Sequence, residues 1–244
     1  MATAASQVIL HPLVSQGLKY GSTTLGRDKL YRTVQYFARF FAWYLLNKGD
    51  KIDAARWSAL KSHLGTARKC KPIEHLQAAL RATLTTGPAL EQILTIGRQL
   101  AYFGYLSYDT LIWANAIKFI SLNPETAKRV GKTSNRLWFA GIVFNLVNGV
   151  LKTVRLKHEA KRLRAGKSRG EKDVGEETQR ETRLSAIKSA QAATRRQFTI
   201  DILDVWLPAT GSGIVNLSEG TLGIFGLITS ILGMQAQWKA VNGK

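Results

Sequence analysis

The side chains that could carry out catalysis or bind a metal are few in this sequence of 244 residues. Its single cysteine, Cys70, cannot form an internal disulfide bond and suits a reducing compartment. Zinc sites need histidines and cysteines at short, regular spacing. The histidines are instead scattered, at His11, His63, His75 and His158.

One segment contains part of a phosphate-binding motif. Gly166, Lys167 and Ser168 match the last three residues of that motif. The first glycine of the motif belongs at position 161, which is Lys161, and no strand is expected before it. We therefore do not expect a nucleotide site here.

Two carboxylates near the C-terminus have a spacing that a metal site or an acid/base pair could use. Asp201 and Asp204 lie three positions apart, but no third ligand stands nearby. We expect them to cap a helix or to pair with Arg195 and Arg196. The sequence thus predicts no catalytic residue, no metal and no cofactor.

Positive charge is the dominant chemical property of the chain. Lysine and arginine number 35 against 16 acidic residues, which gives a formal net charge of +19. Residues 137–151 are nevertheless uncharged, and residues 221–234 form an apolar block rich in glycine. Nucleic-acid binders have no need for such stretches, whereas a protein held on an anionic bilayer needs both features. We therefore expect an anionic phospholipid membrane as partner, and no nucleic acid.

The elements that position these groups are expected to be helices. The five prolines leave long stretches uninterrupted, and alternating β-branched residues are scarce. The sequence predicts an all-α, membrane-associated helical bundle with amphipathic N-terminal helices and apolar, partly membrane-spanning C-terminal helices. We divide it into amphipathic residues 1–90, aromatic and apolar residues 91–151, a basic flexible loop and helix at 152–197, and a Gly-rich membrane helix region at 198–244.

An amphipathic basic segment is expected at residues 53–84, with Asp53 as its cap and Pro72 as a break. Its apolar residues recur at helical spacing and form a candidate membrane-insertion face: Trp57, Leu60, Leu64, Ala67, Ile73, Leu76, Leu80 and Leu84. Its basic residues are candidates for contact with anionic lipids: Arg56, Lys61, Arg68, Lys69 and Lys71. Packing of the same face in an ordinary bundle is the alternative.

The central helices differ in how well they suit a bilayer. We expect residues 28–46 to form a first helix and residues 91–122 to form an interfacial or bundle-packed one, because the latter contains Arg98, Asp109 and Lys118. Residues 137–151 are shorter than a comfortable span, but can be extended if Arg136, Lys152 and Arg155 reach toward headgroups. Asn145 and Asn148 favour a helix partner, so a span and a buried core helix both remain open.

Two C-terminal segments have special compositions. Residues 165–177 are typical of a flexible loop, and the surrounding basic stretch suits either anionic headgroups or solvent. In the last helix, small residues lie along one face and allow close helix packing in a membrane or an oligomer contact. This candidate face consists of Gly220, Gly223, Gly226, Ser230 and Gly233.

Several motifs resemble one known family. Residues 26–36 (GRDKLYRTVQY) and 43–46 (WYLL) are similar to the N-terminal signature of the peroxin-eleven family, most of all its filamentous-fungal members. Further similarities follow in the same order along the chain, at Tyr105, Tyr108, Asp109, Trp113, Leu203, Asp204, Pro208, residues 220–226 and Trp238.

The resemblance implies a peroxisomal membrane protein without catalytic activity. Its cytosol-facing amphipathic helix, residues 53–84 here, would enter one leaflet and would curve and elongate the membrane. It also implies self-association, and cooperation with a fission adaptor and a dynamin-like GTPase in peroxisome fission and proliferation. Pro72 suggests two helices joined by a kink in place of one continuous helix.

A second function is also suggested by the resemblance, namely a pore or solute-conducting assembly in the peroxisomal membrane. Polar groups in apolar surroundings are functional candidates when they face a lumen. Asp109, Asn145, Asn148 and Asp201 are such groups.

Overall fold

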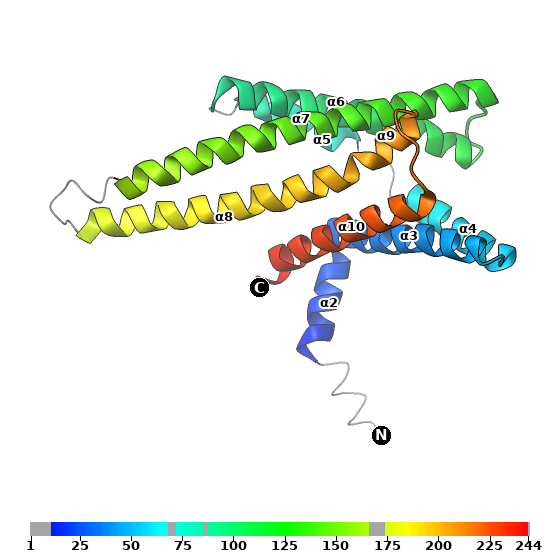
Figure 1. Cartoon of the computed structure of the whole chain (residues 1–244), viewed down its shortest axis with the longest axis horizontal. Helices are drawn as coiled ribbons and strands as arrows, with labels where there is room; N and C mark the ends of the chain where they lie inside the picture. The colour runs from blue at the N-terminus through cyan, green and yellow to red at the C-terminus, as the bar shows by residue number, and fades with distance from the viewer. Residues whose placement is uncertain (1–10, 68–71, 85–86, 166–173, 244) are drawn as a thin grey trace. The chain divides into compact units, whose positions relative to one another are not determined.

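The computed structural model describes residues 11–67, 72–84, 87–165 and 174–243, and Figure 1 shows their arrangement. All regular secondary structure in these ranges is helical, and they contain no strand. The predicted all-α fold class is therefore confirmed. Contacts divide the chain into two compact units, Met1–Lys69 with Val215–Lys244, and Cys70–Ile214.

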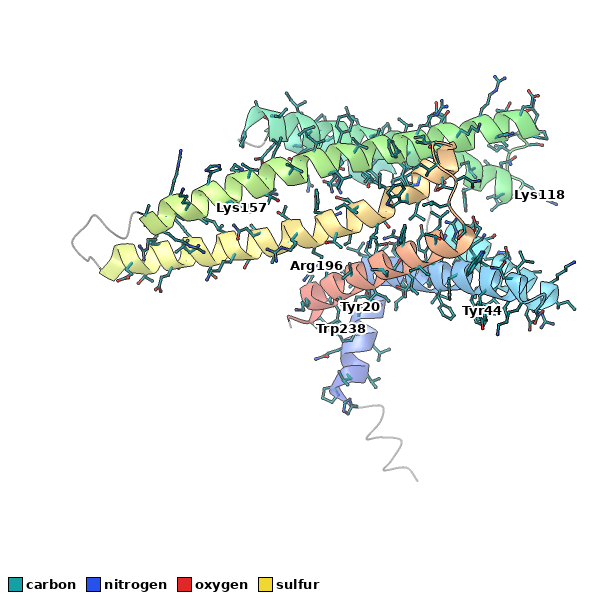
Figure 2. The ribbon with its side chains drawn as sticks, viewed as in Figure 1. Tyr20, Tyr44, Lys118, Lys157, Arg196 and Trp238 are labelled. Atoms are coloured by element: carbon teal, nitrogen blue, oxygen red, sulfur yellow. The ribbon has the colours of Figure 1, made fainter. Side chains whose placement is uncertain are left out.

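The first unit contains α2 (Pro12–Ser22), α3 (Thr24–Asn47), α4 (Lys51–Ala67) and α10 (Glu219–Asn242). The central helix is α3, which packs against both α4 and α10, and Figure 1 shows α3 and α10 side by side. The Tyr20 ring of α2 lies 5.5 Å from the Trp238 ring of α10 (Figure 2). Helix α2 is thereby attached to the end of α10.

Short polar residues cap the starts of three helices of this unit, α3, α4 and α10. The Thr23 hydroxyl accepts a hydrogen bond from the Gly26 N–H at 3.0 Å, and the Ser218 hydroxyl accepts one from the Thr221 N–H at 3.1 Å. At the start of α4 the acceptor is Asp50, not the expected Asp53, because the helix begins earlier, at Lys51.

The second unit contains α5 (Pro72–Leu84), α6 (Ala89–Ala116), α7 (Pro124–Ala165), α8 (Val174–Asp204) and α9 (Trp206–Ser212). In this unit α6 packs against α5 and α7, and α7 also packs against α8 and α9. Figure 1 shows α7 and α8 as a long antiparallel pair. Part of their contact is an apolar cluster of Leu156, Ala160 and Ile187 with Leu163 and Ala190.

Three differences from the expected helices have simple causes. The helix expected at 91–122 ends at Ala116, where Lys118 adopts a left-handed conformation with φ 62°. The uncharged stretch 137–151 is the middle of a 42-residue helix, because nothing between Pro124 and Ala165 breaks helical geometry. Residues 152–165 belong to this helix and residues 174–196 belong to α8. The described part of the loop expected at 165–177 is therefore helical.

The expected break at Pro72 separates α4 from α5, with residues 68–71 lying outside the described ranges. The two halves of the expected amphipathic segment belong to different compact units. Contacts also join the N-terminal region to the C-terminal helix α10, which the sequence-based division had kept apart.

Candidate membrane-contact site

In the part of α5 whose side chains are described, small residues make the packing contacts and two large apolar residues are exposed. Ala79 and Ala82 are 4% and 9% exposed. The Gln92 side chain of α6 donates hydrogen bonds to the carbonyl oxygens of Ala82 and Thr83 at 3.0 and 3.2 Å. Leu80 and Leu84, by contrast, are 61% and 84% exposed. The side chains of Ile73 and Leu76 lie outside the described part of the structure.

The apolar residues of α4 are used differently. The Trp57 ring packs edge-on against the rings of Phe37 and Phe41 of α3, with centroids 5.7 and 4.9 Å away. Leu64 is half-buried, and Leu60 is 38% exposed. Of Ala67 the structure describes the backbone alone. This half of the expected insertion face therefore supplies part of the packing of the first unit.

Two basic residues of α4, Arg56 and Lys61, form ion pairs within the first unit. Arg56 lies 2.8 Å from Asp53 and is strongly exposed. Lys61 lies 3.4 Å from Glu219, whose carboxylate also accepts two hydrogen bonds from Arg39 at 2.9 and 2.7 Å. Arg68, Lys69 and Lys71 lie outside the described residues.

These contacts change the acidity of Glu219. Hydrogen bonds from the Arg39 guanidinium hold the pKa of Glu219 below its ordinary value, and the charges of Arg39 and Lys61 add to this effect. Partial burial acts in the opposite direction. The carboxylate thus joins α10 to both α3 and α4.

The glycine face of α10 lies against α3 of the same chain. A β-carbon at Gly226 would overlap the Tyr36 ring, and one at Gly220 would overlap the Trp43 ring. At Gly223 it would come within 2.7 Å of the Phe40 backbone nitrogen. The other two predicted residues agree with this contact: Ser230 is fully buried, and Gly233 lies beside the Lys29 side chain.

The helix that packs closely on this face is α3 of the same chain. An oligomer contact through the face stays a prediction. A second copy could reach these glycines only by displacing α3. The sequence contained a signal for the intramolecular partner, because Tyr36, Phe40 and Trp43 recur at helical spacing in the opposite order to the glycines.

A second set of close contacts, between α6 and α7, was missed from the sequence. β-carbons at Gly97 and Gly104 of α6 would lie 3.2 Å from Phe144 and 3.0 Å from Leu137. One at Gly141 of α7 would lie 3.0 Å from the Tyr102 ring. The seven-residue spacing of the α6 glycines is the available signal, because it places both on one helix face.

Polar side chains connect the helices of the second unit. Asp201 of α8, which is 4% exposed, accepts a hydrogen bond from Asn145 of α7 and a second one from Gln197, one turn earlier in α8. For Asp201, amides stand where Arg195 or Arg196 was expected, and both arginines are exposed. Asn148 donates to the Thr95 hydroxyl at 3.3 Å. Asn145, Asn148 and Asp201, which were considered for a pore, are thus hydrogen bonded between helices.

An ion pair also joins α6 to α7, beyond the contact of Asn148 with Thr95. Arg155 of α7 donates two hydrogen bonds to Glu91 of α6, at 2.7 and 3.1 Å. The Arg155 side chain, expected to reach toward headgroups, is therefore held by a neighbouring helix. This geometry is bidentate and favours one relative position of the two helices.

Helix α7 is, among the described residues, the one helix long and apolar enough to cross a bilayer. Only 11% of its most apolar 18-residue window is buried, which is unlike the core helix of a soluble protein. In the same residues, no group of three or more histidine, cysteine or acidic side chains is placed to hold a metal ion.

Comparison with known proteins finds one family and relatives that are all peroxisomal proteins. Residues 14–238 match the family described as Peroxisomal biogenesis factor 11 (PEX11). The chain is 26% identical to peroxisomal membrane protein PMP27 of Saccharomyces cerevisiae, over 96% of this chain and 98% of that protein. It is 24% identical to PMP30B of Candida boidinii, over 97% and 98%.

Similarity extends to mammals. The chain is 22% identical to peroxisomal membrane protein 11A of Homo sapiens, over 88% of this chain and 93% of that protein. No solved structure matches it significantly. Because the family match covers almost the whole chain, this protein belongs to the Peroxisomal biogenesis factor 11 (PEX11) family and is a peroxisomal membrane protein.

Proposed function

We propose that this protein drives peroxisome elongation and fission by inserting helix α5 into one leaflet of the membrane. Family membership supports a role in peroxisome proliferation. The observation that carries the mechanism is the exposure of Leu80 and Leu84, at 61% and 84%. The proposal includes no catalytic step.

Different residues of α5 pack on the protein and face outward, so the helix can insert without unfolding the second unit. Ala79 and Ala82 hold the helix on α6, so Leu80 and Leu84 are not needed for packing. Burial of a leucine side chain in an apolar medium is favourable by about 1.5–3 kcal/mol. Insertion of this row expands one leaflet relative to the other, and the area mismatch curves the membrane.

Basic residues assist by contacting anionic headgroups. Arg81 of α5 is exposed beside the apolar row, and Arg56 of α4 is strongly exposed. Each such residue near an anionic surface contributes about 1 kcal/mol. The same role is assigned to Arg68, Lys69 and Lys71, whereas Lys61 must first leave Glu219.

Reconstitution of the full chain into anionic liposomes tests this mechanism. The double variant Leu80→Glu, Leu84→Glu should still integrate but should lose tubulation, because the charged row cannot enter the leaflet. The control Ser185→Glu, Ser189→Glu adds the same two charges, at the same four-residue spacing, to exposed positions of α8 and should retain tubulation. Equal tubulation by both double variants would exclude insertion of this row.

Self-association is part of the proposal, since many small insertions must act together to bend a membrane. Because α3 occupies the glycine face, copies meet through the other apolar row of α10, formed by Ile224, Ile228 and Ile231, which are 37–42% exposed. Crosslinking in peroxisomes should weaken in Ile228→Asn and persist in Ile52→Asn, which changes an exposed isoleucine of α4. Unchanged crosslinking in Ile228→Asn would exclude this row.

The assembled protein would present itself to a fission adaptor and a dynamin-like GTPase, and nucleic acid has no part in the proposal. Affinity capture from peroxisomes of the wild type and of Ile228→Asn measures both partners. Their equal recovery with the variant would show that recruitment does not need assembly.

A further inference from the structure

The turn that joins α6 to α7 presents two large apolar side chains to the outside. Phe119 is 81% exposed and Ile117 is 48% exposed, and we call these two residues the apolar tip. Lys118 lies between them, and Figure 2 labels it at this turn. An apolar ring beside a lysine suits the boundary of a membrane, because the ring can enter the acyl region while the ammonium group stays among the headgroups.

Hydrogen bonds fix the backbone of this turn. The Phe119 N–H donates to the Ala114 carbonyl oxygen at 3.0 Å, and the Lys118 N–H donates to the Asn115 carbonyl oxygen at 3.1 Å. The Asn115 side chain also accepts a hydrogen bond from the Leu122 N–H at 2.9 Å. The apolar tip is therefore exposed by a hydrogen-bonded turn of defined geometry.

Lys118 occupies a backbone position that usually belongs to glycine. Its φ is 62°, and the hydrogen bonds around it are those of a left-handed helix cap, where glycine is preferred because it has no β-carbon. Lysine is conformationally unfavourable in this position. What it adds to the turn is a positive charge beside Phe119.

A row of basic residues continues from this turn along α7. Lys128, Lys132 and Arg136 are exposed and lie on one side of a helix with 3.6 residues per turn, and we call them the basic row. Ser134 lies on the opposite side, where its hydroxyl donates a hydrogen bond to the Tyr105 carbonyl oxygen of α6 at 3.3 Å. The basic row is therefore on the side of α7 that faces away from α6.

The composition of this side of α7 indicates what covers it. Arg129 adds a further exposed cation, and Glu125 is the one acidic residue in 124–136. Beyond the basic row the same side continues with valines that are 37–51% exposed: Val143, Val147, Val150 and Val154. Phosphate headgroups next to acyl chains fit a cationic stretch followed by an aliphatic one, whereas an acidic soluble protein would not account for the valines.

We propose that the α6–α7 turn is a lipid-binding site separate from α5. The apolar tip enters the headgroup boundary of an anionic phospholipid leaflet, and the basic row binds its phosphates. This contact requires no membrane crossing between α3 and α10, which pack on each other. It goes beyond the proposed function, because insertion of α5 neither requires nor supplies it.

A fluorescent dye at position 119 tests the apolar tip. In a Cys70→Ser background, Phe119→Cys gives the full chain one cysteine, which is labelled with an environment-sensitive nitrobenzoxadiazole dye. In liposomes of phosphatidylcholine and phosphatidylserine, this dye should emit at shorter wavelength than the same dye at Ser189→Cys, an exposed position of α8. Lipids with a nitroxide near the headgroup should quench it more than lipids with a deep nitroxide.

The same dye tests the basic row. Replacement of the whole row by glutamine should remove the dependence of this quenching on phosphatidylserine, because the row no longer attracts anionic headgroups. The control removes three exposed positive charges elsewhere on α7 and α8 and should keep the dependence: Arg162→Gln, Arg183→Gln and Lys188→Gln. Unchanged circular dichroism of each variant shows that the helices are intact.

Other results overturn the proposal. If aqueous iodide quenched the dye at position 119 as strongly as the dye at position 189, the apolar tip would lie in water. Emission at short wavelength without quenching by either nitroxide lipid would put protein against the tip in place of lipid. Equal phosphatidylserine dependence in the two glutamine variants would exclude the basic row. Tubulation by α5 is measured separately, so failure of one proposal is distinguishable from failure of the other.

Discussion

Gly223 shows how one missing side chain determines the packing of the first unit. Its α-carbon faces the Phe40 backbone, which cannot move aside as a flexible side chain can. Gly223→Ala should therefore destabilise the contact of α10 with α3 by about 1–3 kcal/mol, as overpacking does elsewhere. Limited proteolysis of the detergent-solubilised protein measures this loss.

The matched control is Gly17→Ala in α2, where a β-carbon meets nothing within 4 Å. Alanine is the better helix former by about 1 kcal/mol, so this variant should be cleaved at the wild-type rate or slightly more slowly. If both alanine variants were cleaved at the wild-type rate, the close approach at Gly223 would have no energetic weight.

Glu219 gives the first unit a dependence on pH. Its pKa is lowered in the folded chain, so its contribution to stability is present above the ordinary value of 4.5 and is lost as the pH falls through the lowered value. Because the carboxylate is half-exposed, this contribution is at most about 1 kcal/mol. Thermal unfolding of wild type and Glu219→Gln should differ at pH 7 and converge in acid. A constant difference would assign the effect to something other than ionisation.

At the scale of elements, α7 should respond to charge according to depth. A lysine at the centre of a spanning helix costs about 2.5–3.5 kcal/mol on insertion scales, whereas one near the edge can reach headgroups. Val147→Lys should therefore reduce membrane integration strongly, and Val154→Lys, on the same face near Lys157, should reduce it only slightly. Carbonate extraction compares the two. Equal extraction of both variants would contradict a lipid-covered face.

The sequence was enough to predict that the chain is helical, but not which helices pack against each other. Proline positions and apolar periodicity were enough to predict an all-α chain and the separation of α4 from α5 at Pro72. The length of α7 was underestimated because the change from apolar to basic composition at Lys152 was taken for the end of a structural region. Helical geometry has no such boundary, since lysine and arginine are good helix formers.

For the candidate site, too, the sequence predicted the apolar faces but not their neighbours. Periodicity identified the apolar rows of α4 and α5 but could not tell that Trp57 packs on Phe37 and Phe41 while Leu80 and Leu84 stay exposed. Likewise, the glycines of α10 were recognisable as a packing face, but α3 as their neighbour depends on contacts between residues about 180 positions apart. Such tertiary choices are not encoded in local spacing.

For the whole molecule, the two compact units carry different parts of the proposed activity. The first, built on α3, carries the exposed apolar row of α10 through which we propose that copies assemble. The second carries both the long apolar helix α7 and the exposed leucines of α5. Loss of curvature should therefore be separable from loss of membrane residence.

Peroxisome length in cells that produce only the Leu80→Glu, Leu84→Glu variant is the most direct measurement of this separation. The variant should remain in the peroxisomal membrane at wild-type abundance, while peroxisomes should become few, round and enlarged. Ser185→Glu, Ser189→Glu in α8 should support normal elongation. Elongated, dividing peroxisomes in cells with the leucine variant would contradict insertion of α5 as the source of curvature.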